Sequence, residues 1–329
     1  MQLKSLAVRA GVLLAALAAS VLGTAARADF PTGPIKLIVP YAAGGGTDGV
    51  ARAFAEGMTR ELKVPVIVDN RPGAGAVVGT QAAVSAAKDG YTMLMAVNGN
   101  MVMSPLLYNN LKFDPAKDLR VFALAVEAPT VAVVNANVPA TTMREFEAYA
   151  KANQGKLFYA TLGQGNVLHI TTKVMETMMG VQMTGVPYKG SAPALAAMMG
   201  GEVQLYMDLA STSIPLIKSG KLKALAVPND KRLEALPEVP TFAEAGYPNF
   251  HAASWMGLAV PTGTPDAVVR TLQAAAQRTI ADARFRDASR SLGMVMLPTM
   301  DEKAITDYVA ADRARWGELV KRYNIMVEQ

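Results

Sequence analysis

Short apolar runs alternate with helical patterns along most of this chain, and this alternation limits the fold more than any other feature. Pro34–Pro40 (PIKLIVP), Val64–Asp69 and Tyr91–Val97 each have the pattern of a buried strand. Helical patterns at Asp48–Leu62 and Gly75–Ala87 separate them. Strands joined by helices form parallel sheets, because a parallel neighbour needs a long crossover. The pattern predicts an α/β fold with mostly parallel sheets flanked by helices.

The same alternation restarts near residue 130 and predicts a second α/β unit. Thr142 and Glu145 have the spacing of a capping box at the start of a helix. The strands expected in this unit are Thr130–Val134, Leu157–Thr161, Met183–Val186, Val203–Asp208 and Lys223–Val227. The helices expected are Thr142–Asn153, Asn166–Met179, Ala192–Met199 and one near Ile214–Ser219.

The last third of the chain predicts a return to the first unit. A proline-rich stretch, Leu236–Pro248, has the composition of a surface connection and precedes an apolar strand at Ala252–Val260. Two helices follow. Pro265–Ile280 has Thr264 as its expected N-cap, and Asp301–Tyr323 is expected to be capped by Thr299 or Asp301.

If that strand joins the first sheet, the chain crosses between two domains twice, near Val126–Pro129 and near Phe250. We therefore expect one domain from residues 29–127 plus 252–329 and another from residues 128–251. Two crossings form a hinge, and hinged domains can close around a ligand.

The first 28 residues have the pattern of an export signal. Lys4 and Arg9 precede a 12-residue apolar run, Gly11–Leu22. After it, Ala26-Arg27-Ala28 has the small-x-small form of a cleavage site. The run is too short for a stable membrane anchor, so we expect cleavage before Asp29 and a soluble mature protein; an uncleaved anchor is the alternative. The chain has no cysteine to acylate, which excludes a lipoprotein.

Charge and composition exclude several classes of function. The signal carries three basic residues and no acid, so its removal lowers the net charge from +5 to +2. No cluster of Lys and Arg stands out, which makes nucleic acid an unexpected partner. The absence of cysteine removes disulfides, thiol catalysis and cysteine-ligated metals. Most of the 19 methionines are expected to fill the core, so neither a metal nor a cofactor is expected.

A glycine-rich segment joins the first strand to the first helix. It runs from Tyr41 to Asp48 and contains Gly44, Gly45, Gly46 and Thr47. Ligands bind at the carboxyl ends of parallel strands, and a helix N-terminus offers free N–H groups and a positive dipole end. The segment therefore indicates an anion site that needs no arginine. The alternative is a plain turn in which Thr47 or Asp48 only caps the helix.

A second segment of this kind follows the strand that ends at Thr161. Gly163 and Gly165 lead to Asn166, a good N-cap, and His169 lies three residues inside the helix. Two facing helix N-termini would suit a ligand with a carboxylate at one or both ends. A lone helical histidine is more often a packing or hydrogen-bonding residue than a catalyst.

Other motifs give weaker indications. Arg71–Gly79 (RPGAGAVVG) has G-x-G-x-x-x-G spacing and follows the second strand, so we interpret it as a tight turn into a helix or a wall of the cleft, not as a dinucleotide site. No G-x-S-x-G or H-E-x-x-H motif is present, and His169 and His251 are the only histidines. No catalytic residue is therefore assigned; a periplasmic hydrolase stays as an alternative.

Several longer stretches resemble the solute receptors of tripartite tricarboxylate transporters, the Bug family. They run in order from about Pro34 to Pro265 and include PIKLIVPYAAGGGTDGVAR, VIVDNRPGAGAVVG, DGYTML, FDPAKDL, GVPYKGSAPAL and LPEVPTFAEAGYP. The resemblance implies a two-domain periplasmic binding protein fold of type II-like form. It also implies capture of a di- or tricarboxylate, an acidic amino acid or an aromatic acid for membrane transporter subunits, by a monomer in the periplasm.

The resemblance also implies which residues bind the ligand. Both glycine segments are carboxylate-gripping positions in the family, and Asp208 aligns with an acid near the family's cleft. The full expected set is Tyr41, Gly44, Gly45, Gly46, Thr47, Asp48, Asn98, Thr161, Gly163, Gly165, Asn166, His169 and Asp208.

Departures from the family pattern bear on the ligand. Asn166 stands where relatives usually have serine, and Met198 where an acid is common. If Met101 and Met103 face the cleft, they favour an apolar or aromatic ligand body. An orphan sensor for a signalling partner is the alternative within the binding class.

Overall fold

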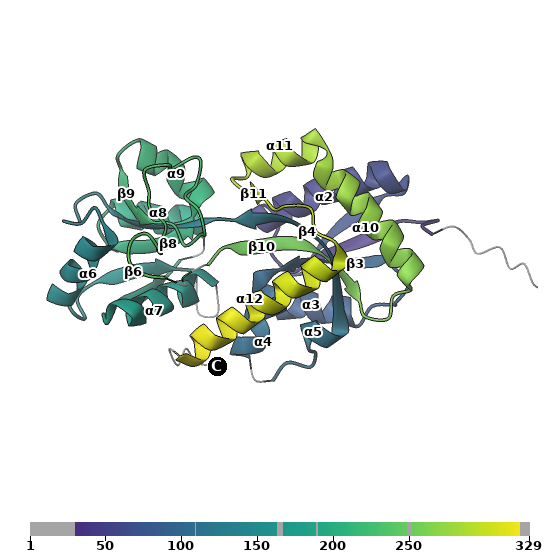
Figure 1. The fold of residues 1–329 in the computed structure, drawn as a ribbon, viewed down its shortest axis with the longest axis horizontal. Coiled ribbons are helices and arrows are strands. Elements are labelled where there is room, and N and C mark those ends of the chain that lie inside the picture. Colours follow the sequence, from purple (N-terminus) through teal and green to yellow (C-terminus); the bar gives the residue numbers. More distant parts are fainter. Residues whose placement is uncertain are drawn as a thin grey trace, which may run out of the picture.

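The computed structural model places the chain in two lobes, each built on its own β-sheet (Figure 1). It describes residues 30–108, 110–162, 167–188, 190–248, 250 and 252–322. The expected export signal therefore lies outside the described residues. Within those residues, no helix is both long and apolar enough to cross a membrane.

The first lobe contains a six-stranded sheet in the order β11-β4-β10-β3-β1-β2. Its strands are β1 (Ile35–Val39), β2 (Val66–Asn70), β3 (Thr92–Val97), β4 (Leu119–Ala128), β10 (Ser254–Pro261) and β11 (Val295–Met296). β1 pairs in parallel with β2 and β3, whereas β10 is antiparallel to both β3 and β4. Strands β1 to β4 therefore all run in one direction, and β10 runs against them.

The second lobe repeats this arrangement with a five-stranded sheet in the order β7-β6-β8-β5-β9. Its strands are β5 (Thr130–Asn135), β6 (Phe158–Thr161), β7 (Thr184–Pro187), β8 (Leu205–Leu209) and β9 (Leu222–Ala226). β6 is parallel to β7 and β8, and β5 is antiparallel to β8 and β9. Strands β6 to β9 therefore share one direction, and β5 opposes them.

The like-directed strands of both sheets point at the junction between the lobes. β4 ends at Ala128 in the first sheet and β5 begins at Thr130 in the second, so the carboxyl end of β4 lies at the junction. Strands β1 to β3 run as β4 does. Strands β6 to β9 run against β5, which leads away from the junction. The carboxyl ends of both sets therefore meet there, where ligands bind in α/β proteins.

The two-domain α/β architecture is confirmed, but the sheets are mixed and less parallel than predicted. In each lobe, the strand that enters from the other lobe runs antiparallel to both of its neighbours. This strand is β10 in the first lobe and β5 in the second. β10 confirms the predicted return strand, whereas β4 was missed. The crossings lie at Pro129 and between Ala226 and Ser254. The domain limits 29–127 plus 252–329 and 128–251 stay a proposal.

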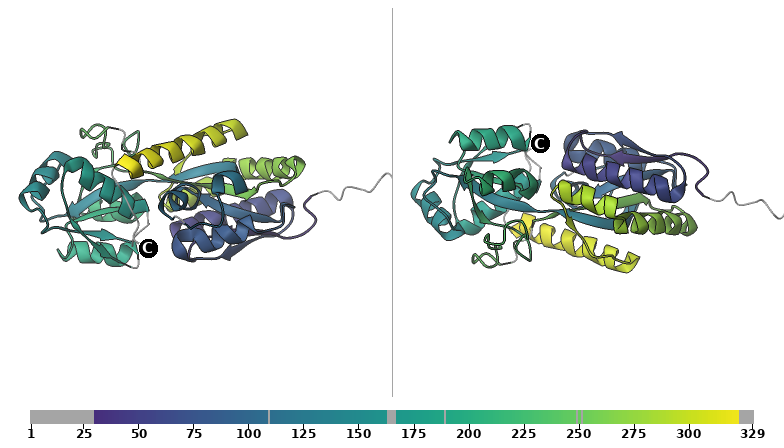
Figure 2. Two further views of the ribbon diagram at one scale, coloured as in Figure 1. Left: turned by 90° about the horizontal axis from the view of Figure 1, so that it is seen from below. Right: turned by 90° about the horizontal axis from the view of Figure 1, so that it is seen from above.

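Helices cover both faces of each sheet (Figure 2). In the first lobe they are α2 (Gly46–Leu62), α3 (Val77–Val84), α4 (Ser104–Leu107), α5 (Pro115–Asp118), α10 (Asp266–Ala281), α11 (Ala283–Ser291) and α12 (Glu302–Arg322), with the short turns η1 (Ala74–Ala76) and η2 (Gly99–Met103). In the second lobe they are α6 (Met143–Ala152), α7 (Val167–Met179), α8 (Ser191–Met199) and α9 (Ala210–Lys218). The capping box of Thr142 and Glu145 is confirmed at α6.

The apolar face predicted for the first helix is buried against α10 and α11. Val50, Phe54 and Met58 are all 0% exposed, and the Phe54 ring lies 4.6 Å from that of Phe285. Burying a side chain of this size stabilises the fold by about 1.5–3 kcal/mol. α2 and α10 approach closely at Gly57, because a Cβ there would lie 2.3 Å from a methyl carbon of Thr279.

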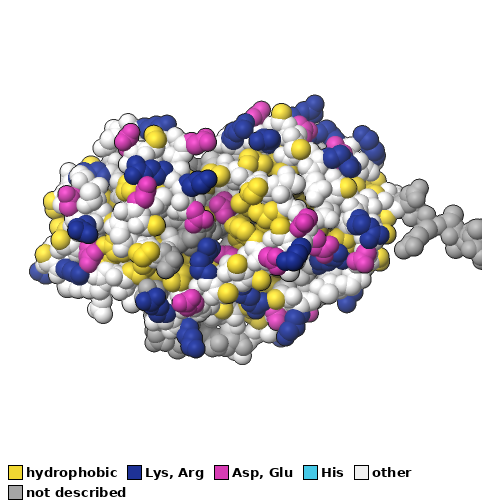
Figure 3. All heavy atoms as spheres, in the orientation of Figure 1, with side chains coloured by type: hydrophobic (Ala, Val, Ile, Leu, Met, Phe, Trp, Pro, Cys, Tyr) yellow, Lys and Arg dark blue, Asp and Glu magenta, His cyan; other side chains and the backbone are white. Residues whose placement is uncertain are grey.

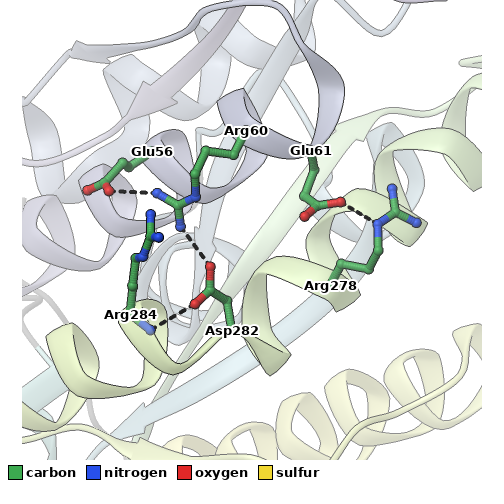
Figure 4. A network of polar contacts seen from close by, with 6 residues as sticks. All are labelled: Glu56, Arg60, Glu61, Arg278, Asp282 and Arg284. Atoms are coloured by element: carbon green, nitrogen blue, oxygen red, sulfur yellow. Dashed lines mark hydrogen bonds and ion pairs between the residues drawn. The ribbon is translucent and has the colours of Figure 1, made fainter.

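Ion pairs join the same helices at their outer ends (Figure 4). Arg60 of α2 contacts Glu56 on its own helix at 2.6 Å and Asp282 at 2.9 Å. Asp282 separates α10 from α11 and also accepts a hydrogen bond from the backbone N–H of Arg284. Arg278 pairs with Glu61. Exposed pairs like these contribute about 0.2–1 kcal/mol each, so burial dominates this contact.

Two sequence expectations for the later chain need correction. Thr264 is not the N-cap of α10: Pro265 takes that position, and the Thr264 hydroxyl donates to the Pro261 carbonyl at 2.8 Å. The Leu236–Pro248 connection is not purely a surface segment, because Phe242 is 0% exposed and the centroid of its ring lies 4.5 Å from that of Phe250, with the two rings tilted. Asp301 does cap α12, accepting from the Ala304 N–H at 2.8 Å.

Gly257 supports a testable prediction about the centre of the first sheet. It lies in β10 between β3 and β4, and a Cβ there would be 2.0 Å from the Ala123 carbonyl oxygen. Gly257→Ala must push the strands apart, so we expect the free energy of unfolding in urea to fall by about 3 kcal/mol, the upper end of overpacking costs. Gly33→Ala, where nothing lies within 4 Å, is the control. Equal effects of the two changes would contradict the prediction.

Candidate functional site

The first glycine segment lies where β1 ends at the junction. Gly44 has φ +86°, a conformation that favours glycine, and Gly45 is the N-cap of α2 without any side-chain cap. The first N–H groups of a helix have no partner within the helix. The segment therefore presents the start of α2 in the form expected of an anion site.

Asp48 holds this segment in place. Its side chain accepts hydrogen bonds from the Gly44 N–H at 2.9 Å, from Arg52 Nε at 2.8 Å and from Asn70 Nδ2 at 2.9 Å. Burial alone would raise the pKa of Asp48, but these hydrogen bonds outweigh it and lower the pKa below its ordinary value. The side chain is only 4% exposed. These contacts assign Asp48 to shaping the segment, with Thr47 half-buried beside it.

Tyr41 and Asn98 lie on the two strands at the centre of this edge, since β1 and β3 are neighbours. The Tyr41 hydroxyl lies against Gly99, where a Cβ would be 2.5 Å from it. Burial raises the pKa of Tyr41, so its hydroxyl keeps its proton. Asn98 follows β3 directly and is 0% exposed; its Nδ2 donates to Asp312 of α12 at 2.5 Å.

The second glycine segment is only partly described. Thr161 ends β6 and is buried, whereas Gly163, Gly165 and Asn166 lie outside the described residues. His169 follows in the first turn of α7, with its Nδ1 3.2 Å from the Tyr159 hydroxyl. Burial, and next the charge of Lys173, lower the pKa of His169 below its ordinary value. These contacts fit the hydrogen-bonding role suggested for a lone histidine.

Asp208 is buried beneath the same edge of the second lobe. It ends β8, is 0% exposed, and accepts from the hydroxyls of Ser191 at 2.7 Å, Thr212 at 2.6 Å and Ser213 at 2.7 Å. Ser191 begins α8, and Thr212 and Ser213 lie in the first turn of α9. Asp208 therefore binds two helix starts together.

The methionine hypothesis loses its basis. Met101 and Met103 lie in η2 and are 3% and 1% exposed within the hydrophobic core. η2 continues the chain after β3 into the space between the sheet and α12, so these side chains fill the core. They give no reason to prefer an apolar ligand body.

The Arg71–Gly79 motif forms the tight turn that was expected of it. Gly73 has φ +142° and Gly75 has φ +61°, both in the region that favours glycine. At Gly79 a Cβ would lie 2.7 Å from the Pro40 Cα, so α3 approaches the end of β1 closely. The motif therefore packs behind the first glycine segment.

A groove of about 1050 Å³ also lies where the lobes meet, on the side of the edge strand β11 (Figure 3). Its walls come from both lobes and include Ile214, Met296 and Arg290. Of the expected ligand-binding residues that the structure describes, none lines it. In the sheet order, β10 and β3 separate its strand β4 from β1 and the first glycine segment. The groove is therefore distinct from the predicted site.

The described part of the site is thus divided between two strand edges that meet at the junction. β1 and β3 bring Tyr41, Gly44–Asp48 and Asn98 together, and β6 and β8 carry Thr161 and Asp208. Sequence reasoning missed Asn70 and Asp312, which contact these residues from other elements, and Arg52, which contacts Asp48 from one turn further along α2. No cluster of acidic and histidine side chains fit for a metal ion occurs among the described residues. This fold and edge define a two-lobed solute-binding protein.

Comparisons with known proteins agree with this class. A family model described as the tripartite tricarboxylate transporter family receptor matches residues 50–325. A UPF0065 protein of Bordetella pertussis is 38% identical over 264 residues, which are 80% of this chain and 81% of that protein. The structure of the periplasmic binding protein BugD is 34% identical with a TM-score of 0.79, covering 91% of this chain and 100% of that one.

Two other similar structures hold ligands. MatC from Rhodopseudomonas palustris, with bound malate, is 31% identical with a TM-score of 0.78 and covers 88% of this chain and 100% of its own. Another R. palustris protein, with adipate, is 31% identical with a TM-score of 0.80 and covers 91% and 99%.

The chain belongs to the tripartite tricarboxylate transporter family of receptors, the Bug family, and the predicted resemblance is confirmed. The family and its structural neighbours are substrate-binding proteins and not enzymes. The hydrolase alternative is therefore set aside.

His169 provides a pH prediction. Because burial lowers its pKa in the folded state, the unfolded chain takes up the proton first as the pH falls below about 7, and stability falls with it. In an NMR titration we expect His169 to titrate below the ordinary value of 6.5. His169→Gln should reduce the loss of melting temperature between pH 7 and pH 5.

The chain has two histidines, so His251→Gln assigns the signals and serves as the matched control. A His169 pKa at or above 6.5 would show that the contact with Tyr159 leaves the imidazole open to water.

Proposed function

We propose that this chain captures a small organic carboxylate between its two lobes and delivers it to membrane subunits of a tripartite tricarboxylate transporter. The observation that carries this proposal is that a helix follows the carboxyl end of a strand in each lobe, α2 after β1 and α7 after β6, and that both strands end at the junction. In the sequence, glycines lie between each of these strands and its helix. A ligand between the lobes would meet helix starts from both sides.

The chemistry of the first segment favours an anion. The start of α2 supplies N–H donors and the positive end of the helix dipole, a combination that stabilises a bound negative charge. Asp48 is turned toward Gly44, Arg52 and Asn70, so its own charge is compensated by protein contacts. A carboxylate can therefore approach the Gly45–Thr47 backbone without an unpaired acid facing it.

Two lobes on a hinge suit a ligand with polar groups at two ends. Malate and adipate, held by two of the similar structures, are both dicarboxylates, which supports this class for the present chain. Such a ligand favours the closed form only if it contacts both lobes there, because ligands shift an equilibrium by their differential affinity. The membrane subunits of the transporter would then recognise the closed form.

The setting proposed for this function is the periplasm, where the export signal would send the chain. We propose that the mature protein acts as a monomer and uses no nucleic acid partner. Loss of ligand uptake when the transporter's membrane subunits are deleted supports delivery to a transporter. Unchanged uptake would instead support a sensor that reports the ligand to a signalling partner.

A thermal unfolding panel tests the ligand class. The mature protein is heated with succinate, malate, adipate, benzoate and their amides. A ligand that binds only the folded state stabilises it by about 2.7 kcal/mol at a concentration 100 times Kd. We expect at least one acid to raise the melting temperature and its amide not to. The panel is repeated after unfolding, dialysis and refolding, which removes any copurified ligand. Equal shifts for acids and amides, or none after refolding, would refute carboxylate capture.

Gly45→Val tests the first glycine segment itself. Gly45 has φ −83° and its nearest new contact would be 3.8 Å away, so the backbone tolerates a side chain there. Two branched methyl groups would stand over the start of α2 and keep a carboxylate from its N–H donors. We expect Kd for the best acid of the panel to rise at least tenfold, measured by calorimetry, with the melting temperature nearly unchanged.

Gly33→Val, which also has open space around it, is the matched control and should leave Kd unchanged. If Gly45→Val binds as well as the wild type, the segment is only a turn.

A further inference from the structure

Two polar groups on α12, the Asp312 carboxylate and the Tyr308 hydroxyl, link this helix to the ends of three strands of the first lobe at the junction. Asp312 is 4% exposed, and its Oδ2 accepts from Asn98 Nδ2 at 2.5 Å and from Trp255 Nε1 at 2.8 Å. Its other oxygen pairs with Arg315. One turn earlier on α12, the Tyr308 hydroxyl donates to Glu127 near the end of β4 at 2.5 Å. α12 is thus bonded to β3, β10 and β4 at the ends nearest the second lobe.

These contacts fix which way the Asn98 amide faces. A carboxylate paired with a guanidinium accepts hydrogen bonds, so it requires the NH₂ group of Asn98 and would repel the amide oxygen. The same carboxylate oxygen also accepts a hydrogen bond from Trp255, and this second bond holds the carboxylate in place. Asn98 Oδ1 must therefore face away from Asp312. It has no hydrogen-bond partner among the described residues, and Asn98 is 0% exposed.

The position of Asn98 in the fold places this residue at the same sheet edge as the candidate site. Asn98 directly follows β3, which neighbours β1 and ends at the same edge. The next residue, Gly99, lies against the hydroxyl of Tyr41, the residue that opens the first glycine segment. A buried acceptor without a donor is costly, by about 1–3 kcal/mol, so a ligand that supplies the donor gains from it.

We propose that Asn98 is a specificity-determining residue and that Asp312 is the positioning residue that orients it. With its NH₂ group committed to Asp312, Asn98 offers an acceptor only. It selects carboxylates that carry a hydroxyl or an ammonium group beside the carboxylate over the unsubstituted acid. This inference rests on the proposed function and narrows its ligand class to hydroxy and amino acids.

Matched ligand series test the selection. Succinate, malate and aspartate differ only in the hydrogen, hydroxyl or ammonium on one carbon; phenylacetate, mandelate and phenylglycine form the aromatic series. Kd is measured by calorimetry on refolded wild-type protein. In the series that binds, we expect the hydroxy or amino acid to bind about 5-fold tighter than the parent acid, the effect of one net hydrogen bond.

Variants then locate the effect. Asn98→Ala removes the acceptor and should abolish the preference between the parent acid and its hydroxy or amino form. Asp312→Ala releases the amide and should also abolish it. If Asp312 acts through Asn98, the double variant loses no more preference than Asn98→Ala alone, because the two residues work as one unit. Asp307→Ala, on the exposed side of the same helix, is the control and should keep the preference.

The outcomes separate the two claims. If wild type binds neither series, nor any acid of the panel, the proposed function fails and this inference fails with it. If an acid binds but its hydroxy and amino forms bind no better, only this inference is overturned. A preference that survives in Asn98→Ala overturns it too, and that result does not depend on whether Asp312→Ala folds. Unfolding curves for each variant confirm that Kd refers to folded protein.

Discussion

Everything else in this molecule depends on the direction in which strands enter each sheet. β10 and β5 each come from the opposite lobe and run antiparallel to their neighbours. The remaining long strands of both sheets therefore end at the junction. That single constraint brings loops from residues far apart in sequence to one place. It also sets the chemistry there, because a loop after a strand leads into a helix start, and helix starts present N–H donors and positive potential.

The sequence predicted the elements better than it predicted their partners. The capping box at Thr142 and the return strand near Ala252–Val260 follow local rules, and the structure agrees with them. Strand direction does not follow local rules, and β4 was missed. The roles of Asp48 and Asp208 could not be predicted from the local sequence pattern either, because some of their hydrogen-bond partners are distant in sequence. Asn70 lies 22 residues from Asp48, and Ser191 lies 17 residues from Asp208.

The candidate site is held by buried polar contacts and not by apolar packing alone. Asp48, Asp208 and Asp312 are each nearly fully buried, and each accepts three hydrogen bonds or ion pairs. A buried carboxylate of this kind is destabilising unless its partners are all present, so each fixes a local geometry that admits few alternatives. The backbone groups that we propose as donors to the ligand thus lie on loops whose shape is set by the side chains that pack behind them.

The positions of the two tryptophans have a consequence for fluorescence measurements on this protein. Trp255 and Trp316 are the only tryptophans of the chain, both are buried, and both lie where α12 packs on the strands that cross between the lobes. The Trp255 ring bonds directly to the carboxylate on α12. Tryptophan emission of the unlabelled protein therefore comes from the contact between α12 and the first sheet, beside the strand β10 that crosses between the lobes. A change in that contact would change the fluorescence of the native chain without any added label.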